Sequence, residues 1–164
     1  MYIFANFNGT QHDVEVVTHE AGHAFAAWTN RDRVPMEYVW PSMEGCEVHS
    51  MSMEFFAEPW ADGFFGPDAK KFLYSHLSGA LTFIPYGTLV DHFQHEVYAN
   101  PDMTLDQMNL VHGQIYQEYF GYPSYFEWVD IHHHFEQPLY YISYATSAVS
   151  ALEIWEIAQT DRES

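Results

Sequence analysis

The chain has 164 residues, 48% of them apolar and 18% aromatic, which excludes a disordered segment and suits one domain spanning residues 1–164. Five basic residues against 23 acidic ones leave a net charge of -18, which repels the phosphates of nucleic acids and anionic membrane surfaces. A single cysteine excludes an internal disulfide framework. Since neither an export signal nor an apolar run of membrane-spanning length is visible, we expect a cytoplasmic protein that binds no nucleic acid and no membrane.

The pattern of apolar residues predicts a mainly α fold. Residues 2–7 are rich in β-formers and end at Asn8-Gly9, which predicts one short N-terminal edge strand. From residue 13 onward, apolar side chains recur every three to four positions and predict a helix over 13–29. Further helices are expected over 44–58, 67–81, 88–99, 104–120, 125–131 and 138–159, with an interruption at Pro85-Tyr86-Gly87.

The first predicted helix carries an HExxH motif, in which His19 and His23 are four residues apart. Positions i and i+4 lie on one face of a helix, so that two imidazoles can converge on one zinc ion. Glu20, next to the first histidine, could reach a water molecule at the metal, which is the arrangement that metal-assisted hydrolysis needs.

Such a zinc site needs a third protein ligand. Glu44, Glu47 and Glu54 are candidates because they lie on the predicted helix that follows. Glu47 and Glu54 are seven residues apart and share a helix face, so that one could bind the metal while the other orients a ligand imidazole. Spacing alone does not choose among the three.

THEAGHAF followed by EVHSMSMEFF closely resembles the thimet oligopeptidase-like family of zinc metallopeptidases, and within it the oligoendopeptidase F branch. Three further blocks resemble that branch in the same order: FANFNGT, IPYGTLVDHFQHEVYANPDMT and HHHFEQPLYYISYATSAVSALEIW. The resemblance runs from about residue 3 to about residue 155, nearly the whole chain.

The resemblance implies a zincin-like helical catalytic core with one zinc ion per chain. By the family's motifs, His19 and His23 are zinc ligands and Glu20 is the general base. The family pattern of a ligand glutamate, a serine three residues later and a glutamate seven residues later makes Glu47 the third ligand. Glu54 would then lie behind the ligands.

Family members also use a histidine and tyrosines of a late segment to hydrogen-bond the tetrahedral intermediate. The branch pattern falls on His133, while the sequence leaves open which of His132, His133 and His134 contacts the substrate. Tyr141 and Tyr144 resemble the paired tyrosines of the family, with Tyr140 as a close alternative and packing in an aromatic core as the other interpretation. The short strand over residues 4–8 could pair with the main chain of an extended substrate, as in zinc peptidases of this general plan.

The chain is also much shorter than typical members of the family, which carry a large N-terminal portion that forms the opposite wall of a deep channel. It is therefore either a natural miniature or a fragment of a longer gene. Surface that the wall would cover becomes exposed, so that we expect an apolar patch and a homo-oligomer, most simply a dimer.

The sequence as a whole predicts a zinc-dependent endopeptidase that acts on peptide substrates. The alternative hypothesis is a catalytically inactive zinc-binding or peptide-binding module that retains the site. An intact Glu20 argues against that alternative, because an inactive relative has no need of the base.

Overall fold

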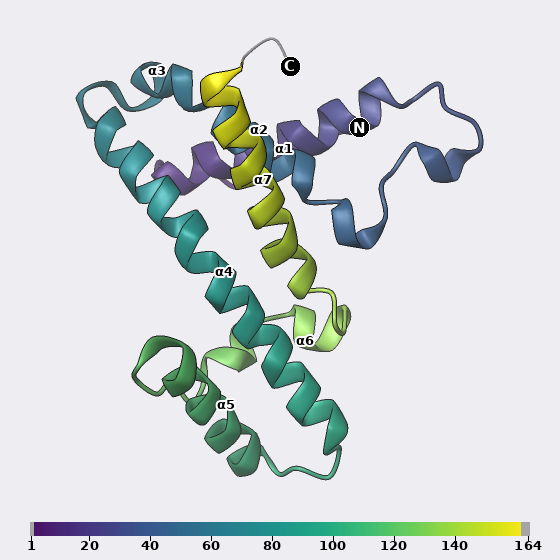
Figure 1. The fold of residues 1–164 in the computed structure, drawn as a ribbon, viewed down its shortest axis with the longest axis vertical. Coiled ribbons are helices and arrows are strands. Elements are labelled where there is room, and N and C mark those ends of the chain that lie inside the picture. The colour runs from purple at the N-terminus through teal and green to yellow at the C-terminus, as the bar shows by residue number, and fades with distance from the viewer. Residues whose placement is uncertain (1, 162–164) are drawn as a thin grey trace. The chain divides into compact units, whose positions relative to one another are not determined.

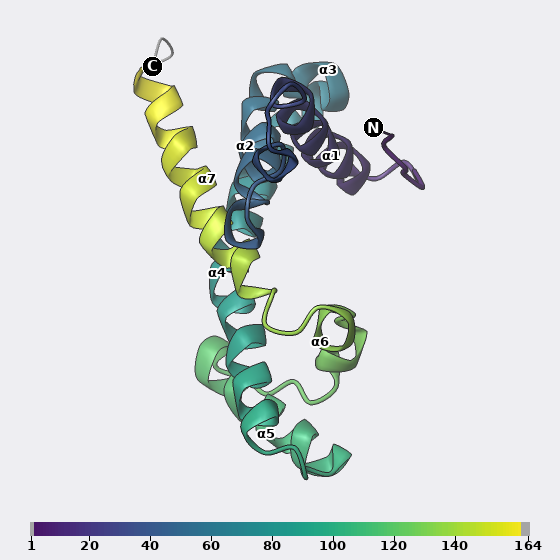
Figure 2. The same ribbon diagram turned by 90° about the vertical axis from the view of Figure 1, so that its right-hand side faces the viewer.

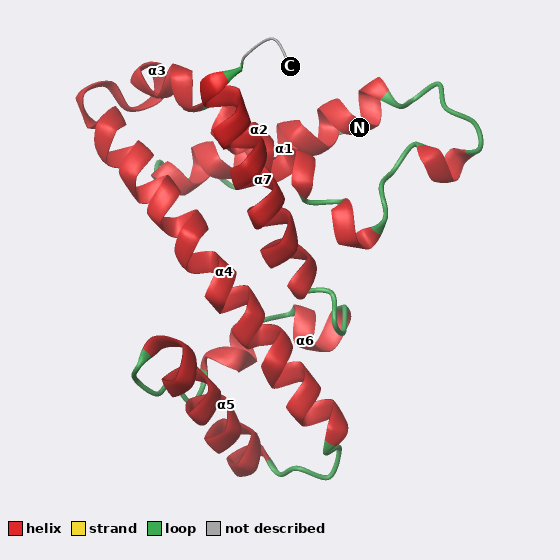
Figure 3. Ribbon diagram, viewed as in Figure 1, coloured by secondary structure: helices red, strands yellow, loops and turns green. Residues whose placement is uncertain are grey.

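The computed structural model describes residues 2–161. These residues form helices joined by loops and turns, and none of them forms a strand (Figure 1; Figure 3). The α-helices are α1 (Gln11–Thr29), α2 (Val48–Phe56), α3 (Ala61–Phe65), α4 (Ala69–Ala99), α5 (Leu105–Phe120), α6 (His133–Glu136) and α7 (Ile142–Thr160). Short 3₁₀ helices cover Met36–Tyr38, Met43–Gly45, Glu58–Trp60, Gly66–Asp68 and Glu127–Asp130. The predicted mainly α fold is confirmed. Among residues 2–161, none of the helices combines the length and the hydropathy that a membrane span needs.

The predicted N-terminal strand is wrong, because residues 2–8 form a loop with no strand beside it among the described residues. A strand is stabilised by its ladder of hydrogen bonds, so β-formers alone do not make one. The end of this segment instead caps α1. The Asp13 carboxylate accepts hydrogen bonds from the backbone N–H groups of Asn8, Gly9 and Thr10 at 3.0, 2.6 and 3.0 Å, which lets the helix begin two residues earlier than predicted.

The chain divides into two compact units. The first unit comprises the residues up to Leu81 together with those from Thr146 onward, and the second comprises Thr82–Ala145. In the first unit α1 packs against α2, and the two helices lie side by side in both views (Figure 1; Figure 2). A small apolar cluster forms between α3 and the start of α4, where the Phe65 and Phe72 rings stack with centroids 4.1 Å apart.

The second unit has its own hydrophobic core, contributed by α4, α5 and the segment that follows them. The buried side chains of this core are Leu89, Val90, Phe93, Ile115, Tyr116, Trp128 and Ile131. At the start of α5, the Thr104 hydroxyl accepts from the Gln107 backbone N–H at 3.3 Å, and the Gln107 side chain accepts from the Thr104 N–H at 2.8 Å. This reciprocal capping fixes the helix start where the sequence predicts it.

The predicted interruption at Pro85 is wrong, because α4 continues through this proline. A proline inside a helix costs about 3 kcal/mol, since it removes a backbone hydrogen bond and crowds the preceding turn. Leu89 and Val90, one turn beyond it, are fully buried in the core of the second unit. Burial of the following turns offsets the local cost.

The last helix also begins later than predicted, at Ile142 instead of residue 138. Leu139 has a positive φ of 62°, a backbone conformation that a helix cannot continue through. The predicted helix over 125–131 is reduced to the 3₁₀ turn Glu127–Asp130. The predicted helix over 44–58 is shorter as well, with a 3₁₀ turn before α2.

Large apolar side chains are exposed in the first unit, among them Phe25, Trp28 and Trp60. Exposed aromatic residues of this kind are what the expected self-association needs. The dimer itself stays a prediction.

Candidate metal centre

The HExxH motif lies on α1 at the point where this helix crosses closest to α2. Gly22, inside the motif, makes this approach possible. A Cβ atom at Gly22 would lie 2.6 Å from the Ser50 Cα and 2.8 Å from the His49 carbonyl oxygen. Because any larger residue would push the helices apart, the glycine holds the histidines of α1 next to the N-terminal end of α2, where Glu47 precedes the first helical residue.

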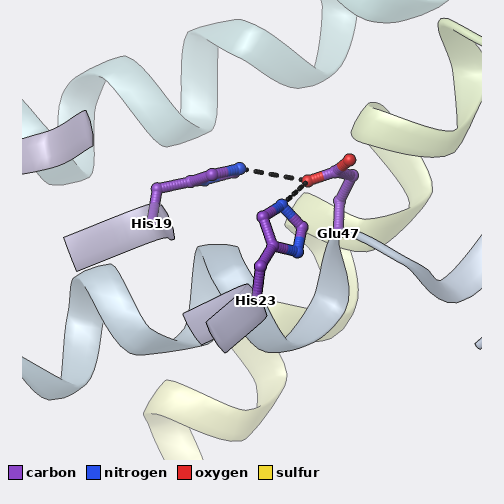
Figure 4. A group of neighbouring side chains, drawn as sticks. All are labelled: His19, His23 and Glu47. Carbon is purple, nitrogen blue, oxygen red and sulfur yellow. Dashed lines mark ion pairs between the residues drawn. The ribbon is translucent and has the colours of Figure 1, made fainter. Parts of the chain in front are cut away.

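His19, His23 and Glu47 converge with their side-chain tips (Figure 4). Glu47 Oε2 lies 3.1 Å from His19 Nε2 and 3.2 Å from His23 Nε2, and all three ligand atoms lie within 4.8 Å of one another. Tetrahedral zinc with bonds of about 2.0–2.2 Å separates its ligand atoms by about 3.3 Å, so the observed spacing fits this ion. Within residues 2–161 no other trio of His, Cys, Asp or Glu side chains comes as close together.

Glu47 is held in place by its own helix turn. The residue is 6% exposed, and the Ser50 hydroxyl lies 3.0 Å from both its Oε2 atom and its backbone oxygen. The Cys46 thiol is buried and lies 3.6 Å from Oε1. These contacts restrict the rotation of the carboxylate and aim one oxygen at the two histidines.

The far side of the His19 ring faces a second carboxylate. His19 Nδ1 lies 2.7 Å from Glu54 Oε1. Burial lowers the His19 pKa, but hydrogen bonds to Glu47 and Glu54 and the charges of both carboxylates outweigh it and raise the pKa to about 9. With Nδ1–H donated to Glu54, Nε2 is the ring atom that faces the other two ligands, which is the usual support for a metal-binding histidine.

The far side of the His23 ring faces another histidine. His23 Nδ1 lies 2.9 Å from His49 Nε2, and the Trp40 ring covers His23 with centroids 5.6 Å apart. Burial and the charge of His23 lower the His49 pKa, which favours the neutral ring that can accept the Nδ1–H of His23. Neither His49 nor Trp40 was predicted from the sequence. The position of His49 in the EVHS block, two residues after Glu47, was the available signal.

The other glutamates of the motif region lie outside the trio. Glu44 is exposed on the 3₁₀ turn before α2, and Glu54 contacts the rear of His19. Glu47 alone of the three candidate glutamates belongs to the converging group. Glu20 is half-buried on α1 directly beside His19.

The late histidine and tyrosines gather in the second unit. Tyr144, in the first turn of α7, places its hydroxyl 3.2 Å from His133 Nε2. The Tyr141 ring lies 5.1 Å from the His133 ring and 5.3 Å from the Tyr144 ring. Tyr140 is buried and stacks on His133. Burial, followed by the neighbouring Tyr86 and Tyr144, raises the Tyr141 pKa well above its ordinary value, so its hydroxyl remains a neutral donor.

A strained turn precedes these tyrosines. Leu139 occupies the left-handed backbone region with φ 62°, and its N–H donates to Gln94 Oε1 at 2.7 Å. Gln94 is almost fully buried at 1% exposure. This contact stabilises a conformation that a leucine rarely adopts, and it thereby fixes where the Tyr140–Tyr141 pair leaves the turn.

A model of peptidase family M3 matches residues 1–164. The chain belongs to peptidase family M3. Among solved structures, a protein assigned as oligoendopeptidase F is 46% identical over 98% of this chain, with a TM-score of 0.92. PZ peptidase A, solved with an inhibitor, is 40% identical over 99% of this chain, with a TM-score of 0.93. The chain spans 30% of the length of each of these two proteins. No curated protein matches the sequence.

Proposed function

We propose that this chain is the catalytic core of a zinc-dependent endopeptidase that hydrolyses peptides. The observation that carries the proposal is the convergence of His19 Nε2, His23 Nε2 and Glu47 Oε2 within 4.8 Å. Membership of peptidase family M3 supports the reaction class. One zinc ion per chain would be held by these three side chains, and a fourth position would remain open for water or substrate.

When bound there, zinc supplies Lewis-acid activation of a water molecule and of the scissile carbonyl. Glu20, beside His19 on α1, removes a proton from the attacking water as its oxygen adds to the carbonyl carbon. The same carboxylic acid then gives this proton to the leaving nitrogen as the C–N bond breaks. Glu47 would contribute one negative charge to the bound metal, and Glu54 would keep the Nδ1–H of His19 in place.

Three residues of the second unit would stabilise the developing oxyanion: His133, Tyr141 and Tyr144. This role comes from the family resemblance, and the contact of the Tyr144 hydroxyl with His133 Nε2 at 3.2 Å supports it, because two polar groups are presented together. Neutral hydroxyl donors aimed at an oxyanion contribute about 10²–10³-fold in rate each.

The test is the Glu20→Gln variant, measured for zinc content and for turnover of a quenched fluorescent peptide library. We expect wild-type zinc content, because Glu20 is not a ligand, and a loss of turnover of about 10²–10⁴-fold. Glu15→Gln, five residues earlier on the same helix, is the matched control and should retain both.

Full turnover in Glu20→Gln would refute the assigned base. Zinc binding without any hydrolysis by the wild type would instead favour the inactive zinc-binding module. Turnover that survives removal of the metal by a chelator would refute zinc as the cofactor.

A further inference from the structure

Behind the candidate metal centre, a line of polar contacts runs from Glu54 through three more side chains of the first unit. Glu54 Oε2 lies 3.0 Å from His76 Nε2 on α4. His76 Nδ1 lies 3.4 Å from Glu58 Oε1. Glu58 Oε2 accepts a hydrogen bond of 2.9 Å from the indole N–H of Trp155 on α7. Segments far apart in the sequence thus meet behind one proposed ligand, His19.

His76 is the central member of this line and is 7% exposed. The Phe72 ring stacks on it with centroids 5.6 Å apart, and the Phe55 ring lies 4.7 Å away. Aromatic groups therefore cover the ring faces, while both ring nitrogens point at carboxylates. Burial lowers the His76 pKa, but the hydrogen bonds and charges of Glu54 and Glu58 outweigh it and raise the pKa to about 9. At neutral pH both ring nitrogens thus carry protons, and both can donate.

The two oxygens of Glu54 are consequently engaged from two directions. Oε1 faces His19 Nδ1 at 2.7 Å and Oε2 faces His76 Nε2 at 3.0 Å. A carboxylate held at both oxygens cannot rotate away from either partner, so the Nδ1–H of His19 has one fixed acceptor. Supporting hydrogen bonds of this kind set the tautomer and the ring orientation of a metal-binding histidine.

We propose that His76 is a positioning residue for the metal centre, which Glu58 and Trp155 hold in place and which fixes Glu54 and, through Glu54, the orientation of His19. The inference rests on the proposed zinc site. It assigns His76 a role that neither the HExxH motif nor the segment around Glu47 contains. It also makes α7, through Trp155, part of the support for a ligand on α1.

The test measures zinc affinity by competition with a chromophoric chelator, together with the visible spectrum of the cobalt-substituted protein. His76→Phe keeps the ring packing and removes both donors, and we expect zinc affinity to fall by about 10–100-fold with an altered cobalt spectrum. His112→Phe is the matched control. His112 is a buried histidine of the second unit that contacts the Ser124 carbonyl oxygen at 2.6 Å, and its loss should leave both readouts unchanged.

Two amide variants separate positioning from packing, and they keep the proposal testable if His76→Phe does not fold. The amide nitrogen of His76→Gln can take the place of Nε2 and donate to Glu54, so zinc affinity should stay within about threefold of wild type. The amide nitrogen of His76→Asn corresponds to Nδ1 and faces Glu58, so affinity should fall as in His76→Phe. If His76 contributed only to stability, the zinc affinities of His76→Gln and His76→Asn would change by the same factor.

The experiment distinguishes a failure of the proposed zinc site from a failure of the positioning role of His76. A wild-type protein that binds no zinc would overturn the proposed metal centre itself. Wild-type zinc binding together with unchanged affinity and cobalt spectrum in His76→Phe, or with equal affinities in the Gln and Asn variants, would overturn the positioning role and leave the zinc site standing.

Discussion

In the first unit, His19 and His76 aim both ring nitrogens at carboxylates, whereas in the second unit His112 and His134 pack against the ring of Phe93. The carboxylates raise the pKa of His19 and of His76 to about 9. Burial, aided by the charges of neighbouring histidines, lowers the pKa of His134 to about 4. Burial lowers the pKa in all of these cases, and for His19 and His76 the hydrogen bonds and charges of two contacting carboxylates outweigh it.

The difference matters for chemistry. The first unit concentrates anionic oxygen around imidazole nitrogen, which is the environment that a zinc ion would occupy. The second unit surrounds His133 with three tyrosine rings and offers neutral hydroxyl donors instead. The two units thus differ in the polar groups that they present, and the predictions below test this contrast.

The largest effect is expected for Glu47→Ala, which removes one of three proposed ligands. Apparent zinc-binding free energies of about 10–16 kcal/mol are shared among a few ligands, so the loss should weaken affinity by on the order of 10³-fold. Glu44→Ala, on the exposed turn before α2, should bind zinc normally. Full zinc content in Glu47→Ala at micromolar metal would remove Glu47 from the ligand set.

The next largest effect is expected on the kcat of Tyr144→Phe, in the cluster of tyrosines around His133 in the second unit. If the hydroxyl meets the oxyanion only in the transition state, kcat should fall by about 10²-fold with little change in KM. Zinc content should stay at the wild-type level. Tyr140→Phe, at a buried and stacked position, should leave turnover intact. A Tyr144→Phe kcat within about twofold of wild type would assign Tyr144 to the core.

Gly22→Ala tests the close contact of α1 and α2. The added methyl group would lie 2.6 Å from the Ser50 Cα, and such overpacking should destabilise the protein by about 1–3 kcal/mol and reduce zinc affinity. Gly79, inside α4, has open space where its Cβ would lie, so Gly79→Ala should stabilise the helix by about 0.5–1 kcal/mol. Denaturant titrations measure the change in unfolding free energy of each variant, which should be a loss for Gly22→Ala and a gain for Gly79→Ala. Equal changes in the two variants would contradict the packing argument.

The pH dependence of stability should have opposite signs in the two units. His76 has a folded pKa of about 9, above the ordinary histidine value of about 6.5, so its contribution is complete below about pH 6.5 and is lost as pH rises through 9. His134 has a folded pKa of about 4. Its unfolded form takes up the proton first, and the native state loses stability as pH falls from about 6.5 toward 4.

Each contribution changes by at most about 1.4 kcal/mol per pH unit. Urea titrations of the metal-free wild type, His76→Phe and His134→Phe across this range measure each difference in unfolding free energy. A difference between wild type and His76→Phe that stays constant from pH 6.5 to 9 would contradict a charged His76.

The parts of this molecule that local sequence determines were predictable. The spacing of His19 and His23 needs only a helix, and the capping residues Thr104 and Gln107 lie three positions apart. The third ligand was harder, since spacing left three glutamates open until the family resemblance selected Glu47. The start of α1 at Gln11 was missed by two residues because the Asp13 carboxylate reaches back to the preceding turn.

Long-range contacts explain the remaining errors and omissions. Pro85 signals a break, yet the burial of Leu89 and Val90 keeps α4 continuous. Residues 2–8 have β-forming composition but no neighbouring strand within the described residues. The role of His76 could not be predicted at all, because its partners Glu54 and Glu58 lie on another segment that only the fold brings next to it.

The central claim is that zinc binds between His19, His23 and Glu47. A crystal of the full chain soaked with zinc, with data collected on both sides of the zinc absorption edge, tests it most directly. We predict one anomalous peak per chain at about 2.0–2.2 Å from His19 Nε2, His23 Nε2 and a Glu47 carboxylate oxygen. Full occupancy at another cluster, or no peak between these three side chains while the protein remains folded, would contradict the proposed metal centre.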